Sequence, residues 1–202
     1  MSLYNSLWRE NHGLWEFIIS FDNVLSKSEC QKLIKFYESS KKASVDDHRA
    51  QYTGLQLFQD PRPEAFKWYQ KLEKKLLPYA EKYEKKLVNM AHEDYKPSEI
   101  LANTNDICFR SLQVQHYNPE SKGYSAVHVE SGKNHCKRYL ACILYLNTLK
   151  DDDGATVFPL AGHWETPKAG TLVVWPSGLP FYHKGLKSSE DKYILTTWYE
   201  FL

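Results

Sequence analysis

The sequence predicts a mainly β protein of the α+β class, in which helices precede a sandwich or jelly roll. Two observations carry this prediction. Residues 25–97 place apolar residues at helical spacing, whereas residues 106–202 alternate with a period of two between Gly, Pro, Asn and Asp clusters. The 14 tyrosines, 9 phenylalanines and 6 tryptophans also suit short, half-buried strands. We therefore expect a single domain over residues 1–202, with an N-terminal strand and supporting helices in 1–105 and the jelly-roll core in 106–202.

The first elements are predicted from local patterns. Residues 15–21 have the composition of a strand. Ser26 and Glu29 match a capping box, in which each side chain bonds the backbone N–H of the other residue. The helix that follows should end at about Ser39, with Cys30 and Leu33 on its buried face.

A second helix should begin at Pro63, because proline suits the first helical turn. Pro78 should break it, because a proline inside a helix clashes with the preceding turn. The Lys/Glu-rich stretch to Met90 is interpreted as a solvated face, with a partner-binding basic patch as the alternative. The predicted apolar stripe consists of Phe66, Tyr69, Leu72 and Leu76.

The second half of the chain predicts strands. Residues 139–146 are nearly all apolar, as in a strand buried on both faces. The polar segments 41–62 and 118–127 are expected to be loops, and residues 41–54 in particular could cover a substrate as a lid. The predicted strands are 111–117, 139–146, 170–175 and 192–201.

The bulk composition argues against several classes of protein. A formal charge of +1 gives no reason to expect nucleic-acid binding. No run of 18 apolar residues is present, so no membrane span is expected, and residues 1–15 lack the pattern of a secretory signal. The four cysteines contain no CxxC pair and are interpreted as reduced thiols in a cytoplasmic protein, although their even number leaves a disulfide open.

His128 and Glu130 are two residues apart, so in an extended strand both side chains point to the same side. His183 follows another strand-like segment. Two imidazoles and one carboxylate form the facial triad of iron(II) oxygenases, which leaves the opposite coordination positions open. An isolated His-x-Glu is more often a surface pattern, and the same three ligands also suit zinc in a hydrolase, although no HExxH helix is present.

Lys192 opens a strand face that continues with Ile194, Thr196 and Trp198. A lysine at the start of such an apolar face needs a partner, unless it lies at the surface. Tyr117 shares a polar strand face with Gln113 and Gln115, which suits either solvent or the lining of a polar cavity, and alternation points His116 away from it. Trp175 and Trp198 are predicted to be core residues.

Several of these segments occur together in a characteristic order: 112–117 (LQVQHY), 128–130 (HVE), 138–147 (RYLACILYLN), 154–159 (GATVFP), 167–175 (PKAGTLVVW), His183 and Lys192. In this order they resemble the catalytic core of the prolyl 4-hydroxylase-like group of the 2-oxoglutarate/Fe(II)-dependent dioxygenase superfamily. The resemblance covers residues 106–202 and departs from the family at two points. Glu130 stands where the family has Asp, and the spacing from His183 to Lys192 is one residue shorter than usual.

The resemblance implies a double-stranded β-helix (jelly roll) and a dioxygenase. It implies Fe(2+) held by His128, Glu130 and His183, which are then the catalytic residues. It implies 2-oxoglutarate bound through Lys192, Tyr117 and Thr156, with O2 as co-reactant and ascorbate as a reductant. The expected reaction is hydroxylation of an unactivated C–H bond, first of all in a prolyl residue of a peptide or protein.

Other functions are compatible with the same residues. The cofactor site could act on a small molecule or carry out an oxidative demethylation. The fold could also be a non-catalytic double-stranded β-helix that binds sugar or protein. The expected partners are a peptide, protein or small-molecule substrate, without nucleic acid or membrane.

Overall fold

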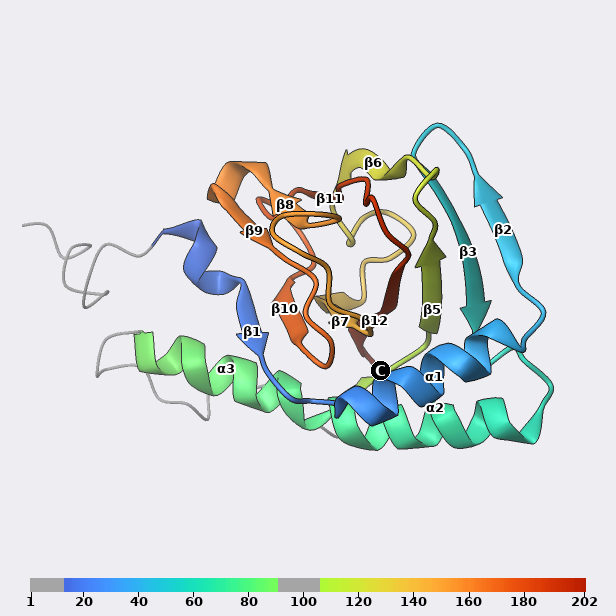
Figure 1. The fold of residues 1–202 in the computed structure, drawn as a ribbon. Helices are drawn as coiled ribbons and strands as arrows, with labels where there is room; N and C mark the ends of the chain where they lie inside the picture. Colours follow the sequence, from blue (N-terminus) through green and yellow to red (C-terminus); the bar gives the residue numbers. More distant parts are fainter. Residues whose placement is uncertain (1–12, 91–105) are drawn as a thin grey trace, which may run out of the picture.

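The computed structural model describes residues 13–90 and 106–202 (Figure 1). The N-terminal residues 1–12 and the end of the predicted helical half, 91–97, lie outside the described residues. The helical elements are η2 (Leu14–Phe17), α1 (Lys27–Glu38), α2 (Pro63–Leu76), α3 (Pro78–Met90) and η4 (Pro159–Ala161). The strands are β1 (Ile19–Phe21), β2 (Ala43–Asp46), β3 (Ala50–Gln56), β4 (Ile107–Cys108), β5 (Leu112–Tyr117), β6 (Gly123–His128), β7 (Arg138–Tyr145), β8 (Thr156–Phe158), β9 (His163–Glu165), β10 (Leu172–Pro176), β11 (His183–Gly185) and β12 (Lys192–Phe201).

The strands form a curled antiparallel sheet in the order β1-β10-β7-β12-β5-β3-β6-β11-β8-β9, with β2 and β4 attached to β3 and β12. The strands β10, β7, β12, β5 and β3 make one wall, and β6, β11, β8 and β9 fold over to face it (Figure 1). This arrangement is a double-stranded β-helix, and it confirms the predicted jelly-roll core with supporting N-terminal helices.

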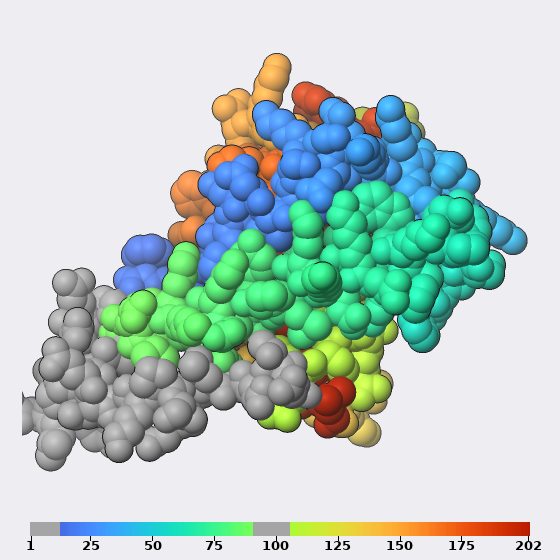
Figure 2. All heavy atoms as spheres, turned by 90° about the horizontal axis from the view of Figure 1, so that it is seen from below, coloured from blue at the N-terminus to red at the C-terminus, as the bar shows by residue number. Residues whose placement is uncertain are grey.

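Strand alternation divides the buried residues into two cores. One face of β5 and β7, including Leu112, Val114 and Leu144, packs with Leu33 and Leu72 from the helices. The helices α1, α2 and α3 cover that face from outside, and Figure 2 shows them side by side in blue to green. The second core lies between the two walls and contains Tyr117, Ala141, Ile143, Tyr145, Phe158, Trp175 and Ile194. Strand β7 contributes to both cores, which confirms the prediction that it is buried on both faces.

The helix boundaries follow the predicted signals. The Ser26 hydroxyl accepts from the Glu29 N–H at 3.2 Å, and the Glu29 carboxylate accepts from the Ser26 N–H at 2.9 Å, so the capping box is formed. Helix α2 ends at Leu76 and α3 begins at Pro78, as the proline predicts. The predicted stripe is wrong at Phe66, which is 52% exposed, because neighbouring Ala65 points to the core instead.

Two predictions for the first half need correction. Residues 15–21 are not one strand, because residues 14–17 form a 3-10 turn before β1 begins at Ile19. Residues 41–62 are not a loop throughout, because they contain the hairpin of β2 and β3, and β3 lies between β5 and β6 in the sheet. Similarly, β6 begins at Gly123 inside the second predicted loop. The polar residues of β3 line a cavity, so the hydrophobic alternation that predicts a strand is absent.

All four cysteines are free thiols, two of them buried and Cys136 exposed. Among the residues that the structure describes, no helix has the length and apolar content needed to cross a bilayer. Strands β1, β2 and β3 join the same sheet as the later strands. The division of the domain at residue 105 stays a prediction.

Candidate functional site

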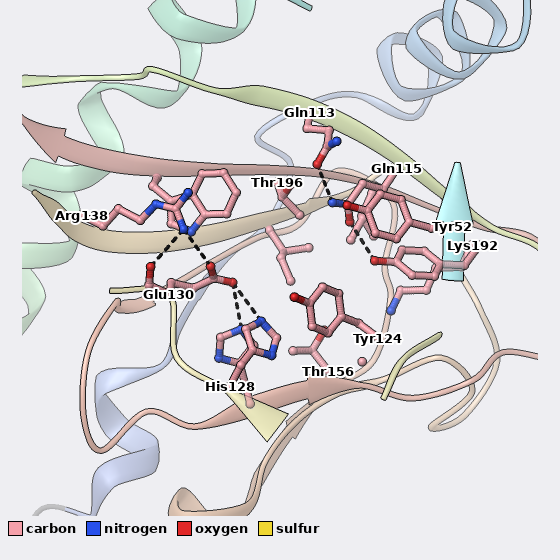
Figure 3. Close-up of a pocket in the computed structure, with 16 residues that line it drawn as sticks. Tyr52, Gln113, Gln115, Tyr124, His128, Glu130, Arg138, Thr156, Lys192 and Thr196 are labelled. Atoms are coloured by element: carbon pink, nitrogen blue, oxygen red, sulfur yellow. Dashed lines mark hydrogen bonds and ion pairs between the residues drawn. The ribbon is translucent and has the colours of Figure 1, made fainter. Parts of the chain in front are cut away.

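His128, Glu130 and His183 meet at one end of a cavity between the two walls. Their ligand atoms all lie within 4.8 Å of one another. His128 ends β6 and His183 begins β11, and the antiparallel pairing of these strands sets the two histidines directly opposite each other. Glu130 follows two residues after His128, and its Oε1 atom is 3.3 Å from His128 Nε2 and 3.2 Å from His183 Nε2 (Figure 3).

The backbone orients both imidazoles. His128 Nδ1 donates to the carbonyl of Ala126 at 2.9 Å, and His183 Nδ1 donates to the carbonyl of Phe181 at 3.2 Å. Each ring therefore presents Nε2 to the other two members of the cluster. A backbone acceptor on the far ring nitrogen is the usual way in which proteins orient metal-ligating histidines.

Glu130 is held from two directions. Burial alone would raise its pKa, but hydrogen bonds from His128 and His183 outweigh burial and keep the pKa well below its usual range. The outer oxygen, Oε2, lies 3.3 Å from Nη1 of Arg138, which also donates to the Glu130 carbonyl at 3.0 Å. The Arg138 guanidinium lies 3.7 Å from the ring centre of Trp198. Trp198 was predicted to be a core residue, and the structure instead places it in the cavity wall as a support for Arg138.

Lys192 lies deep in the same cavity and is 3% exposed. Its ammonium donates to the Gly154 carbonyl at 2.6 Å. Within the described residues no carboxylate forms an ion pair with Lys192, and burial lowers its pKa to about 8. A buried cation without a counter-ion is costly, so this end of the cavity suits an anionic group.

Tyr117 and Thr156 lie in the same cavity as Lys192. Tyr117 pairs with Lys192 across β5 and β12 and donates to Oε1 of Gln115 at 2.8 Å. Burial raises the pKa of Tyr117 well above its usual value, so its hydroxyl stays a neutral donor. The Thr156 hydroxyl accepts from Tyr145 at 2.8 Å, which leaves its own hydrogen free to donate.

The cavity has a volume of about 200 Å³. All six residues that the sequence singles out as ligands or cofactor contacts line it, whereas His116 bonds Asp191 outside it, as alternation predicts. Sequence reasoning missed Tyr52 and Tyr124. The ring centroids of Tyr124 and His128 are 4.2 Å apart. Both residues lie on the same face of β6, so strand alternation could have predicted that Tyr124 lies in the site. Tyr52 lies on β3, where the sequence predicts a loop.

Known proteins match this chain in two comparisons. Residues 112–200 match the family described as the 2OG-Fe(II) oxygenase superfamily. A Pseudomonas putida prolyl-4-hydroxylase is 19% identical with a TM-score of 0.64, over 92% of this chain and 93% of that chain. None of the curated proteins matches the sequence significantly.

Two further solved structures share the fold. A viral collagen prolyl hydroxylase from Paramecium Bursaria Chlorella virus-1, described as a 2OG complex, is 19% identical with a TM-score of 0.61, over 92% of this chain and 97% of that chain. A prolyl hydroxylase from Trichoplax adhaerens, in complex with a hypoxia inducible factor peptide fragment, is 15% identical with a TM-score of 0.59, over 92% of this chain and 84% of that chain. With the family match over residues 112–200, these likenesses support the resemblance that the motifs indicate: this part of the chain matches the 2OG-Fe(II) oxygenase superfamily, and the described structure has the fold of the solved prolyl hydroxylases.

Proposed function

We propose that this oxygenase hydroxylates a prolyl residue of a peptide or protein. One observation carries the cofactor part of the proposal: a single cavity contains the His128–Glu130–His183 cluster and, deep within it, Lys192, with which no carboxylate of the described residues forms an ion pair. The first group suits Fe(II), and the second suits the far carboxylate of 2-oxoglutarate.

The donor set fits iron. His128 and His183 would each offer Nε2, since Nδ1 is already used by a backbone carbonyl, and Glu130 would offer Oε1. Arg138 is a positioning residue in this proposal, because its contact with Oε2 keeps the longer glutamate side chain turned toward the histidines. Ligand partners of this kind commonly change metal affinity by about 10- to 100-fold when they are removed.

The deeper part of the cavity fits the cosubstrate. Lys192 would pair with its distal carboxylate, and Tyr117 and Thr156 would each donate a hydrogen bond. When bound, iron and 2-oxoglutarate supply the oxidising power that converts a C–H bond to C–OH, using O2 and releasing succinate and CO2. The protein's own part is to orient both ligands and to exclude water with buried residues such as Ile143, Ile194 and Phe158.

The prolyl substrate is supported by the neighbours with the same fold. The three solved structures are described as prolyl hydroxylases, one of them acting on collagen by its name and one bound to a peptide fragment. Substrate contacts lie on variable segments, so the acceptor has to be tested directly.

The test is mass spectrometry of proline-containing peptides incubated with the protein, Fe(II), ascorbate and 2-oxoglutarate. We expect a gain of one oxygen on proline, matched by succinate release. Unmodified peptides combined with succinate release driven by a small molecule or a methylated base would replace the prolyl assignment with another acceptor. An absence of succinate under all conditions would favour a non-catalytic binding module.

A further inference from the structure

We propose that Gln113 is a specificity residue that binds a peptide bond of the substrate where it enters the cavity, an inference that rests on the proposed peptidyl function. Gln113 lines both a cavity and a neighbouring groove. It belongs to the wall of the cofactor cavity and to an open groove of about 460 Å³ beside it. The groove also includes Lys41, Gly54, Gln56, Asp60 and Arg62. The Gln113 side chain therefore lies at the junction between the outside and the site of chemistry.

Gln113 ends a hydrogen-bonded chain that starts beside Lys192. Tyr117 donates to the Gln115 carbonyl oxygen at 2.8 Å, and the Gln115 amide nitrogen donates to the Gln113 carbonyl oxygen at 2.8 Å (Figure 3). Gln115 is only 6% exposed, so its amide has to be satisfied within the protein. The direction of the chain leaves the amide nitrogen of Gln113 free for other partners. It bonds Tyr52 in the cofactor cavity and lies next to Gly54, which lines the groove.

The chain also connects the two binding regions. A tyrosine hydroxyl donates one hydrogen, so a Tyr117 that gives its hydrogen to a cosubstrate must accept from Gln115 instead. The side-chain amides of Gln115 and Gln113 then both have to flip, so that their oxygen and nitrogen atoms exchange places. In that state Gln113 presents its carbonyl oxygen to the groove. A peptide bond offers both a donor and an acceptor, so it can pair with Gln113 in either orientation.

Gly54 supplies an independent observation. It lies inside strand β3, where glycine weakens a strand and marks a close approach of other groups. A Cβ atom at position 54 would lie 2.8 Å from Nε2 of Gln113 and 3.2 Å from the Tyr52 ring. The absence of a side chain at position 54 thus makes room for the Gln113 amide at the mouth of the cavity. Two glutamines on an inward strand face are not needed for packing, because apolar residues fill such positions better.

The experiment measures binding of proline-containing peptides, among them a Pro-Pro-Gly repeat, by calorimetry under anaerobic conditions with Fe(II) and 2-oxoglutarate. Gln113→Leu should weaken peptide binding roughly threefold to tenfold, the loss expected for one hydrogen bond, and should weaken 2-oxoglutarate binding less, because Gln113 reaches Tyr117 only through Gln115. Gly54→Ala should reproduce the effect, because the added methyl group displaces the flexible end of Gln113 and shifts the Tyr52 ring by much less. Gln70→Leu, the same change on the exposed face of α2, is the matched control and should bind like the wild type.

The outcomes separate the two proposals. If the wild type binds the peptides and both Gln113→Leu and Gly54→Ala bind them equally well, the role of Gln113 is overturned. A loss of 2-oxoglutarate affinity in Gln113→Leu at least as large as the loss of peptide affinity would also overturn it, because Gln113 would then act mainly on the cosubstrate. If the wild type binds the peptides without hydroxylating them, the proposed reaction fails, while the contrast between Gln113→Leu and Gln70→Leu still tests the contact. A wild type that binds no peptide overturns both.

Discussion

The cavity has two parts, the metal-ligand cluster and the Lys192 region. Both bury charged groups, but the protein compensates these charges in opposite ways. At the ligand cluster, Glu130 accepts from two histidines and lies beside Arg138, so each charge has a partner within the protein. In the Lys192 region, the ammonium donates to the Gly154 carbonyl and lies 5.5 and 6.0 Å from the centres of two tyrosine rings, and Asp153 attracts it without forming an ion pair.

This difference in charge compensation predicts how a bound ligand would affect each region. The cluster is already ordered by its internal contacts, so a metal ion would replace the contacts of Glu130 with the histidines while Arg138 stays in place. Lys192 carries an unfavourable burial energy that only an incoming anion can offset. We therefore expect variants of the cluster to abolish function, and variants in the Lys192 region to act mainly on cosubstrate affinity.

The largest effect is expected from His183→Ala, which removes one of the three ligands. This variant should lose its bound iron and all turnover, as measured by elemental analysis and succinate release. His163→Ala is the matched control, because His163 bonds Glu165 at 2.8 Å on β9 and is not among the cavity-lining residues. Unchanged iron content in His183→Ala would refute the ligand assignment.

The second-largest effect is expected from Lys192→Ala. Loss of a charge-assisted contact costs about 1.5–3 kcal/mol, which corresponds to a roughly 10- to over 100-fold weaker binding of 2-oxoglutarate. Titration calorimetry with 2-oxoglutarate measures this directly. Lys184→Ala, on β11 but absent from the cavity wall, should bind normally. If both variants bind like the wild type, Arg138 becomes the next basic partner to test, because it does line the cavity.

The pH dependence of binding gives a smaller effect with a defined sign. Burial lowers the pKa of Lys192 to about 8, and only the charged lysine attracts a carboxylate. The affinity for 2-oxoglutarate should therefore be constant below about pH 8 and fall by roughly tenfold per pH unit above it. The contribution of Lys192 to folding stability should rise over the same range, since the unfolded chain, with a lysine pKa near 10.5, binds more protons.

Lys192→Arg provides the control for this pH profile. A guanidinium stays charged throughout the accessible range, so the affinity of this variant should not fall above pH 8. A wild-type profile that is equally flat would contradict the role given to Lys192.

The smallest effect is expected from Glu130→Asp, which restores the ligand that the related family carries. The shorter side chain keeps a carboxylate near the histidines but gives up the 3.3 Å contact with Arg138. Iron affinity should fall by about tenfold, the lower end of the range for a lost ligand partner, because Arg138 still donates to the carbonyl of residue 130; anaerobic titration measures it. A loss as complete as in His183→Ala would show that the length of Glu130 is indispensable.

Local patterns predicted the elements whose signals are contained within a few residues. The capping box at Ser26, the break at Pro78 and the strand Lys192–Phe201 all occur where the sequence places them. The hairpin of β2 and β3 was missed for a physical reason. Tyr52 on β3 lines the cofactor cavity and Gly54 lines the groove beside it, so the apolar alternation typical of a strand is absent.

The amino-acid sequence alone predicts which residues can supply the chemistry of the site and how far apart they lie along the chain. His128 and Glu130 share one side of an extended segment, and the ordered motifs lie in the part of the chain, residues 112–200, that matches the 2OG-Fe(II) oxygenase superfamily. Three features come from the tertiary structure alone. His183 lies opposite His128, and Arg138 contacts Glu130. Gln113 and Gln115 face a cavity instead of solvent. The reason is that periodicity fixes which residues share a face, whereas strand pairing between distant segments determines what that face meets.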